Sequence, residues 1–209
     1  VPKFLMGEDG SIGARNDVQV VSLEHKLGIH ASPTCVMAFG EHGDGAVGEL
    51  VGDPHDGMRQ MFTMMNDARL GVGLQGLAVA ERAAQHAEAF ARDRLQGRAP
   101  GAAPGVQSPI IDHPDVRRML LETRATIDAM RALCYENARA IDLSLNAVDE
   151  DGRRAGQRMA DLLTPLAKSW CTDLGVELTS TALQVFGGMG YVEETGVAQH
   201  LRDARIAPI

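Results

Sequence analysis

The sequence is poor in several features that mark whole classes of protein. Aromatic residues make up 4% of the 209 residues, and the 3 cysteines are far apart with no C-x-x-C pair. This cysteine usage argues against a disulfide framework and against a zinc site built on thiolates. No run of 18 apolar residues occurs, so the sequence predicts no membrane-spanning helix.

Basic residues are also scarce. The chain has 20 Lys and Arg against 28 Asp and Glu, which gives a formal net charge of −8. Because nucleic acids and anionic membranes are bound by basic surfaces, we expect neither partner. The 7 histidines contain no helix-spaced pair beside an acidic residue, and we expect no metal site.

The two ends of the chain carry no targeting or stop signal. The chain begins at Val1 without a signal-peptide pattern, and it ends at Ile209 without a capped helix or a polar tail. We therefore expect a segment of a longer protein. Unpaired cysteines are typical of a reducing compartment, so we also expect a cytoplasmic protein.

The first quarter of the chain is β-prone. The runs 18–23 and 34–39 are rich in β-branched and apolar residues, and glycines interrupt residues 1–52 at short intervals. This pattern predicts short antiparallel strands. They are too few to close a sheet alone, so we assign residues 1–52 to a partial β-domain.

From residue 53 onward the apolar residues recur with a helical period, which predicts a long helix over about 57–94. A Pro/Gly-rich loop over 97–109 follows, and Asp112-His113-Pro114 indicates the start of the next helix. That helix has apolar and small polar residues at alternating spacings of four and three, the seam of a bundle helix: Val116, Leu120, Thr123, Ile127, Met130, Cys134, Asn137 and Ile141.

A turn over 149–152 and a third long helix complete the pattern. We expect this helix to end near Phe186, and a short last helix, capped by Thr195, to reach Arg205. The predicted fold is mainly α, an up-and-down antiparallel helical bundle over residues 53–209 preceded by a partial antiparallel β segment. The buried side of the third helix is expected to carry Met159, Leu163, Leu166, Trp170, Leu174 and Leu178.

Two glycine clusters stand out. The segment 71–76 matches the dinucleotide pattern G-x-G-x-x-G, but it lies inside a predicted helix with no preceding strand. We interpret it as small residues that allow close helix packing. In 187–190, three of four residues are glycine. A helix end needs only one glycine, so this stretch indicates a ligand that approaches the backbone closely.

The motifs together resemble those of the acyl-CoA dehydrogenase family. The stretches 184–191 (QVFGGMGY) and 201–206 (LRDARI) resemble its C-terminal signature, and 26–34 (KLGIHASPT) resembles its middle β-domain. The stretches 66–69 (NDAR) and 94–96 (RLQ) fall in the expected order between them. The form of 28–37 and 64–70 is most similar to the branch that acts on 3-methylthiopropionyl-CoA.

This resemblance implies an FAD-dependent oxidoreductase of fatty acid metabolism that converts an acyl-CoA thioester to a trans-2-enoyl-CoA. A carboxylate removes the α-proton, while a hydride leaves the β-carbon for FAD. The cofactor-binding positions that it implies are Arg94 and Gln96, with Gln184, Val185, Phe186, Gly187 and Gly188. Asn66 and Arg69 match a pair near the CoA thioester, although many relatives have Asp where this chain has Asn66. From the local sequence alone, Asn66 and Arg69 are an ordinary surface group.

The resemblance places the usual catalytic glutamate two residues after Ile209, so we expect no catalytic residue within the 209 residues and no activity from the segment alone. The resemblance further implies a homodimer or homotetramer, in which Arg94 and residues 184–188 reach the cofactor of a neighbouring subunit. An electron-transfer flavoprotein is the expected electron acceptor.

Two other functions stay open at this stage. One is a flavin-containing, DNA-associated relative with little enzymatic activity, which the charge of −8 disfavours. The other is a structural helical bundle without a ligand, which leaves the glycines of 187–190 unexplained.

Overall fold

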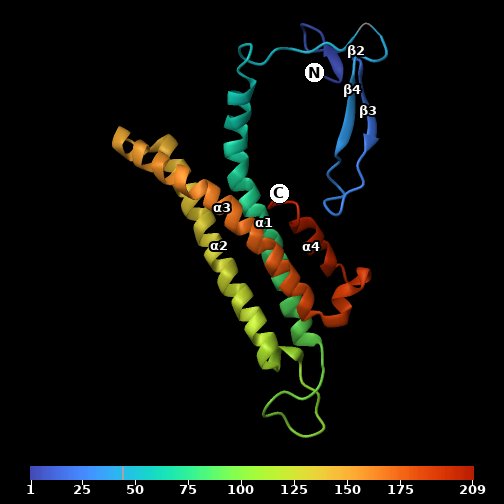
Figure 1. Ribbon diagram of the computed structural model, residues 1–209, viewed down its shortest axis with the longest axis vertical. Coiled ribbons are helices and arrows are strands. Elements are labelled where there is room, and N and C mark those ends of the chain that lie inside the picture. The colour runs from blue at the N-terminus through green and yellow to red at the C-terminus, as the bar shows by residue number, and fades with distance from the viewer. Residues whose placement is uncertain (44) are drawn as a thin grey trace. The chain divides into compact units, whose positions relative to one another are not determined.

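The computed structural model describes residues 1–43 and 45–209, and it confirms a mainly α fold preceded by short antiparallel strands (Figure 1). The chain divides into two compact units, Val1–Thr63 and Met64–Ile209. The assignment of residues 1–52 to a middle β-domain and of 53–209 to the bundle stays a prediction. Among the described residues, no helix is both long and apolar enough to cross a membrane.

The first unit contains two antiparallel hairpins. The strands β3 (Val18–Leu23) and β4 (Cys35–Phe39) pair as the sequence predicts, whereas the pairing of β1 (Phe4–Met6) with β2 (Ile12–Arg15) was not predicted in detail. Within this unit, apolar side chains of both β3 and β4 are exposed, among them Val20 at 56% and Phe39 at 54%. Two-stranded sheets cannot bury both faces, which agrees with the prediction of a partial sheet.

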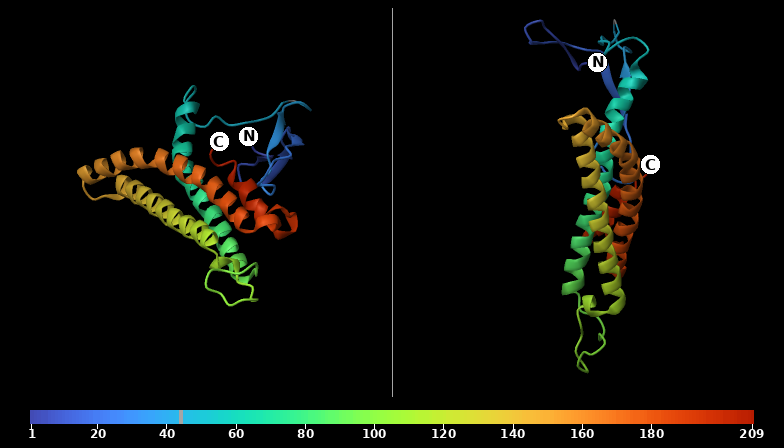
Figure 2. Two further views of the ribbon diagram at one scale, coloured as in Figure 1. Left: turned by 60° about the horizontal axis from the view of Figure 1, so that its bottom comes forward. Right: turned by 90° about the vertical axis from the view of Figure 1, so that its left-hand side faces the viewer.

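The chain has three long helices: α1 (Gly57–Asp93), α2 (Pro114–Asn146) and α3 (Glu150–Val185). The second unit contains α2, α3 and α1 from Met64 onward. The views in Figures 1 and 2 agree that they run side by side, with α2 and α3 joined as an antiparallel pair. The predicted seam of α2 is confirmed. Its centre is buried, and the outer positions are partly buried; the buried members are Thr123, Ile127, Met130, Cys134 and Asn137.

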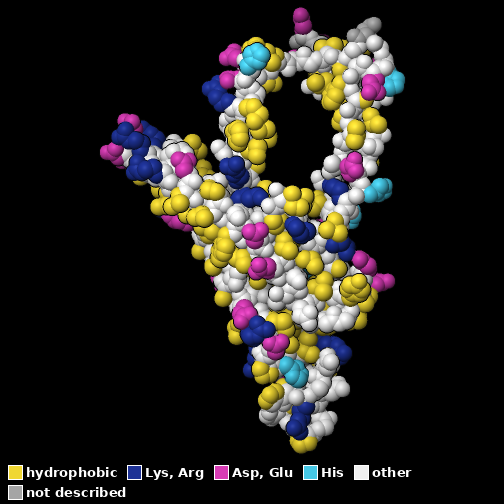
Figure 3. Space-filling model, viewed as in Figure 1, with side chains coloured by type: hydrophobic (Ala, Val, Ile, Leu, Met, Phe, Trp, Pro, Cys, Tyr) yellow, Lys and Arg dark blue, Asp and Glu magenta, His cyan; other side chains and the backbone are white. Residues whose placement is uncertain are grey.

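The predicted buried side of α3 is wrong in part. Met159, Leu166 and Trp170 are 42%, 49% and 42% exposed in this chain, and apolar side chains remain visible on the surface in Figure 3. The helix instead buries mainly small residues, because its neighbours approach too closely for large ones: Gly156, Ala160, Ala167, Cys171, Thr172, Gly175, Leu178, Thr179, Ala182 and Val185.

The close approach is centred on glycines. A Cβ atom at Gly76 would lie 2.6 Å from the carbonyl oxygen of Cys171, and one at Gly175 would lie 3.0 Å from the carbonyl oxygen of Gly76. Gly73 packs in the same way against Ala167, whereas a Cβ at Gly71 would meet open space. The helix-packing interpretation of the 71–76 pattern therefore holds for two of its three glycines.

Two predicted helix boundaries need correction. Asp149 caps α3 by accepting a hydrogen bond from the backbone N–H of Gly152 at 2.6 Å, so most of the expected 149–152 turn is already helix. Thr195 does not cap the last helix. It belongs to a 3₁₀ turn (Glu193–Thr195), and α4 (Val197–Ala204) begins after Gly196, whose φ of 73° suits glycine.

Candidate functional site

The ends of α1 and α3 meet through two stacked aromatic rings. The rings of Phe90 and Phe186 lie 4.2 Å apart between centroids, with an interplanar angle of 15°. They pack against a buried cluster that also contains Ala87, Val185 and Ile110. Because Phe186 directly precedes Gly187, this contact holds the glycine-rich stretch beside the end of α1.

Arg94 lies one turn beyond Phe90, and its backbone N–H donates to the Phe90 carbonyl at 2.9 Å. Its guanidinium donates to the backbone carbonyl of Leu95, and among the described residues no carboxylate pairs with it. An exposed arginine without an internal anionic partner is free to bind an external anion.

The backbone around Arg94 is fixed by the segment on the far side of the 97–109 loop. The Arg94 carbonyl accepts from the N–H of Ile110 at 2.8 Å, and the Gln96 N–H donates to the carbonyl of Ser108 at 2.9 Å. The Gln96 carbonyl also contacts Nε2 of His113 at 2.8 Å. The base of the loop is therefore closed, and Arg94 and Gln96 lie on a pinned backbone.

The three glycines after Phe186 differ in whether the local structure requires glycine. Gly187 ends α3 with a φ of 57°, a conformation that favours glycine. A Cβ at Gly190 would lie 2.4 Å from the Leu183 carbonyl oxygen, so internal packing excludes a side chain there. Gly188 has neither constraint, because its φ is ordinary and a Cβ would meet nothing within 4 Å.

Of these three glycines, Gly188 is the one that neither its backbone conformation nor packing among the described residues explains. The ring contact brings the ends of α1 and α3 together, so a bare backbone and an unpaired arginine follow two helix ends that meet. Such a pair can accept a flat, anionic ligand that needs close approach. This donor set fits a dinucleotide with a pyrophosphate, such as FAD. Val185 is 5% exposed and belongs to the core, while Gln184 is exposed beside the same stretch.

Asn66 and Arg69 form a separate group on α1. Nη1 of Arg69 donates to Oδ1 of Asn66 at 3.1 Å, one helical turn away. From Arg69 to Phe90 the helix rises by roughly 30 Å at about 1.5 Å per residue. The structure places Phe90, one turn before Arg94, against Phe186 of the 184–188 stretch. It leaves Asn66 and Arg69 far along α1 from Phe90.

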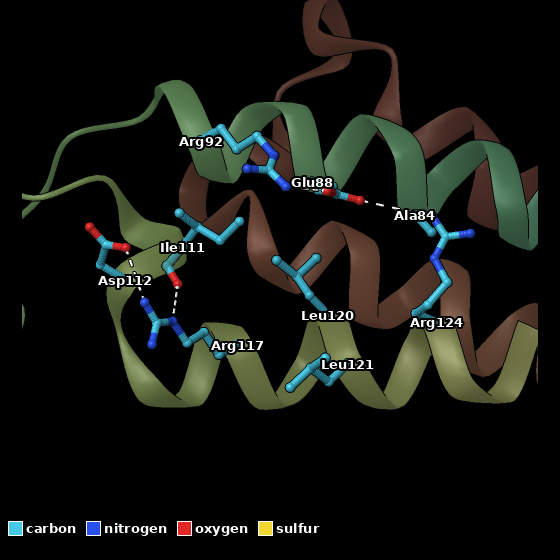
Figure 4. Close-up of a pocket in the computed structure, with 9 residues that line it drawn as sticks. All are labelled: Ala84, Glu88, Arg92, Ile111, Asp112, Arg117, Leu120, Leu121 and Arg124. Carbon is cyan, nitrogen blue, oxygen red and sulfur yellow. Dashed lines mark hydrogen bonds and ion pairs between the residues drawn. The ribbon is translucent and has the colours of Figure 1, made fainter.

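A cavity of about 480 Å³ opens between α1 and the start of α2 (Figure 4). Its arginines are already paired, Arg92 with Glu88 at 2.6 Å and Arg117 with Asp112 at 3.2 Å. Arg124 binds Glu81 at 3.1 Å. These charges are compensated internally, so each arginine that lines the cavity has a carboxylate partner, unlike Arg94.

The sequence analysis missed a histidine pair. Nε2 of His200 on α4 lies 3.0 Å from Nδ1 of His86 on α1. Burial lowers the pKa of both imidazoles, and Arg82 lowers them further. The two residues are 114 positions apart, so no local pattern could have found them.

The chain is similar to known proteins in both sequence and fold. Residues 55–209 match the family described as acyl-CoA dehydrogenase, C-terminal domain. Over its whole length the chain is 51% identical to the 3-methylmercaptopropionyl-CoA dehydrogenase of Ruegeria pomeroyi, and it spans 35% of that relative.

Two solved structures share the fold. The Caenorhabditis elegans ACDH-11 structure in complex with C11-CoA superposes with a TM-score of 0.79 at 27% identity, covering 98% of this chain and 31% of that chain. The butyryl-CoA dehydrogenase of Megasphaera elsdenii gives 0.72 at 27% identity, covering 92% and 44%. The motif resemblance is confirmed, and the chain belongs to the acyl-CoA dehydrogenase C-terminal domain family.

Proposed function

We propose that this chain is the cofactor-holding helical part of an FAD-dependent acyl-CoA dehydrogenase. The relative at 51% identity carries the name of such an enzyme, and the match runs through every motif of the chain. The observation that carries the proposal is the ring contact of Phe90 with Phe186, which joins the segment of the unpaired Arg94 to the segment of the unexplained Gly188.

In this proposal Arg94 would bind the pyrophosphate of FAD, and Gln96 would contact the flavin. The segment 184–188 would contact the cofactor, with no side chain at Gly187 and Gly188 to keep the backbone away from it. The bound flavin supplies the acceptor for the hydride that leaves the acyl β-carbon. The residues of this chain hold that cofactor and exclude water from its dinucleotide end.

Asn66 and Arg69 belong to the thioester end of the same proposal. Negative charge develops on the thioester oxygen as the α-proton leaves, so donors close to that oxygen lower the barrier. Arg69 and Asn66 carry such donors, and their mutual hydrogen bond of 3.1 Å holds them in register on α1. The base that takes the α-proton is the glutamate expected two residues after Ile209.

The proposed substrate is 3-methylthiopropionyl-CoA or a short acyl-CoA of similar size, and the product is the matching 2-enoyl-CoA. We further propose a homodimer or homotetramer in the cytoplasm, in which Arg94 and 184–188 reach the cofactor of a neighbouring subunit. An electron-transfer flavoprotein is the proposed electron acceptor.

The test is anaerobic mixing of the full-length flavoprotein with a panel of acyl-CoAs that includes 3-methylthiopropionyl-CoA. Rapid loss of the oxidised flavin absorbance with one thioester is the expected result. A flavin that stays oxidised with every thioester would contradict the dehydrogenase proposal and favour a flavin-containing binding protein.

A further inference from the structure

Two cysteines from different helices meet in the core of the bundle. Sγ of Cys134 on α2 lies 3.7 Å from Sγ of Cys171 on α3, and both side chains are fully buried. The sulfur of Cys171 also lies 3.9 Å from the Met130 carbonyl oxygen. Nothing in the proposed dehydrogenation uses these thiols.

The backbone around the pair is tightly held. Cys134 and Cys171 belong to one buried cluster with Leu77, Ile127 and Met130. The carbonyl of Cys171 faces Gly76 so closely that a Cβ there would lie 2.6 Å from it. The two sulfur atoms are therefore held near each other by three packed helices.

We propose that Cys134 and Cys171 form a reversible interhelical disulfide when the protein meets a peroxide. The sulfur atoms need to approach from 3.7 Å to about 2.05 Å, a change within the reach of small side-chain rotations. The bond would link α2 to α3 near the middle of both helices, a modification site independent of the flavin.

The chemistry balances with hydrogen peroxide as the oxidant. The Cys134 sulfur, as thiolate, attacks one peroxide oxygen, the O–O bond breaks, and hydroxide leaves to take up the thiol proton as water. The Cys171 sulfur then attacks the sulfenic sulfur, the S–O bond breaks, and a second water leaves. Two thiols lose two electrons, and peroxide is reduced to two waters.

The environment of the two thiols differs. A hydrogen bond from Cys171 lowers the pKa of the Cys134 thiol. The same contact, together with burial, raises the pKa of Cys171. These directions favour Cys134 as the first nucleophile and Cys171 as the resolving thiol, and the same disulfide forms in either order. Because both are buried, we expect the reaction to be slower than at an exposed thiol.

The folded protein is treated with hydrogen peroxide, and the oxidant is then removed. The protein is next denatured in the presence of excess iodoacetamide, which alkylates every remaining free thiol. Peptide mapping is expected to give a Cys134–Cys171 linked peptide that dithiothreitol abolishes, while Cys35 stays outside the link. Recovery of Cys134 and Cys171 as alkylated thiols, or as unlinked sulfinic acids, would overturn the proposal.

Variants and thermal unfolding sharpen the result. Cys35→Ser is expected to retain the link, whereas Cys134→Ala and Cys171→Ala are each expected to lose it. Since a cross-link between residues 37 positions apart restricts the unfolded chain, the oxidised protein is expected to melt about 5–15 °C higher. If the Ala variants fail to fold, the peptide map and the melting shift of the wild-type protein test the proposal by themselves. A lower melting temperature after oxidation would contradict a disulfide that fits the fold.

Discussion

Phe90 and Phe186 stack at 4.2 Å and join two segments that are nearly a hundred residues apart in the sequence. Phe90 lies in the last turn of α1, shortly before Arg94, and Phe186 directly follows α3, before Gly187 and Gly188. This contact joins the two segments that carry the motifs. Stacked aromatic pairs contribute about 0.5–1.5 kcal/mol beyond their burial, enough to hold the two helix ends in a fixed relation.

The first prediction concerns Gly188. Gly188→Val places a side chain in open space, so the free energy of unfolding is expected to change by less than about 0.5 kcal/mol while flavin content after gel filtration falls. Gly190→Ala is the matched control for packing, because its Cβ would lie 2.4 Å from the Leu183 carbonyl oxygen. It should lower the melting temperature. Full flavin content in a folded Gly188→Val protein would argue against the site.

The second prediction concerns Arg94. A charge-assisted contact is worth about 1.5–3 kcal/mol, so Arg94→Ala should weaken FAD binding by roughly 10- to 150-fold. Arg98→Ala removes an equal charge from the exposed loop nearby and should leave the dissociation constant almost unchanged. Equal losses in both variants would indicate a general charge effect rather than a specific contact.

The third prediction concerns the attachment of α4 through His86 and His200. Because burial lowers both pKa values in the folded chain, the released state binds more protons below the ordinary histidine pKa of about 6.5. Arg82 adds to this effect and Asp203 opposes it for His200. The attachment is therefore complete above about pH 6.5 and weakens as the pH falls.

Amide hydrogen exchange within α4, corrected for the intrinsic effect of pH, measures this attachment. Protection is expected to fall between neutral pH and about pH 5 in the wild type. His200→Gln removes one titrating group but keeps a hydrogen-bonding side chain, so its protection should depend less on pH. The same pH dependence in both proteins would rule out the histidine pair as the cause.

The fourth prediction concerns the glycines of α1. Gly76→Ala forces a Cβ against the Cys171 carbonyl and should destabilise the bundle by about 1–3 kcal/mol. Gly71→Ala meets open space and should stabilise it by about 0.5–1 kcal/mol, because alanine favours the helix over glycine. Denaturant unfolding of the two variants measures the difference, and equal effects would contradict the close approach of α1 to α3.

Much of this fold follows from sequence periodicity, because the α2 seam repeats at a fixed spacing and the helix ends carry proline and glycine signals. The buried side of α3 could not be predicted in this way. Hydrophobicity favours Leu166 and Trp170 as core residues, but the approach of Gly76 to Gly175 leaves room only for small side chains there.

The candidate site was predicted only through the resemblance of its motifs. Periodicity places Arg94 and Gly188 after the ends of different helices and gives no reason for those helix ends to lie close together. That proximity depends on a long-range ring contact between Phe90 and Phe186. The His86–His200 and Cys134–Cys171 pairs could not be predicted for the same reason, since each joins residues from distant parts of the chain.

The central claim is that residues 90–97 and 184–190 form one flavin-binding surface. Amide hydrogen exchange of the full-length flavoprotein, measured with and without FAD, tests this claim most directly. The account predicts that FAD protects both segments together, while the α2–α3 connection around Val148 is unchanged. Protection of neither segment, or of only one, would contradict the account.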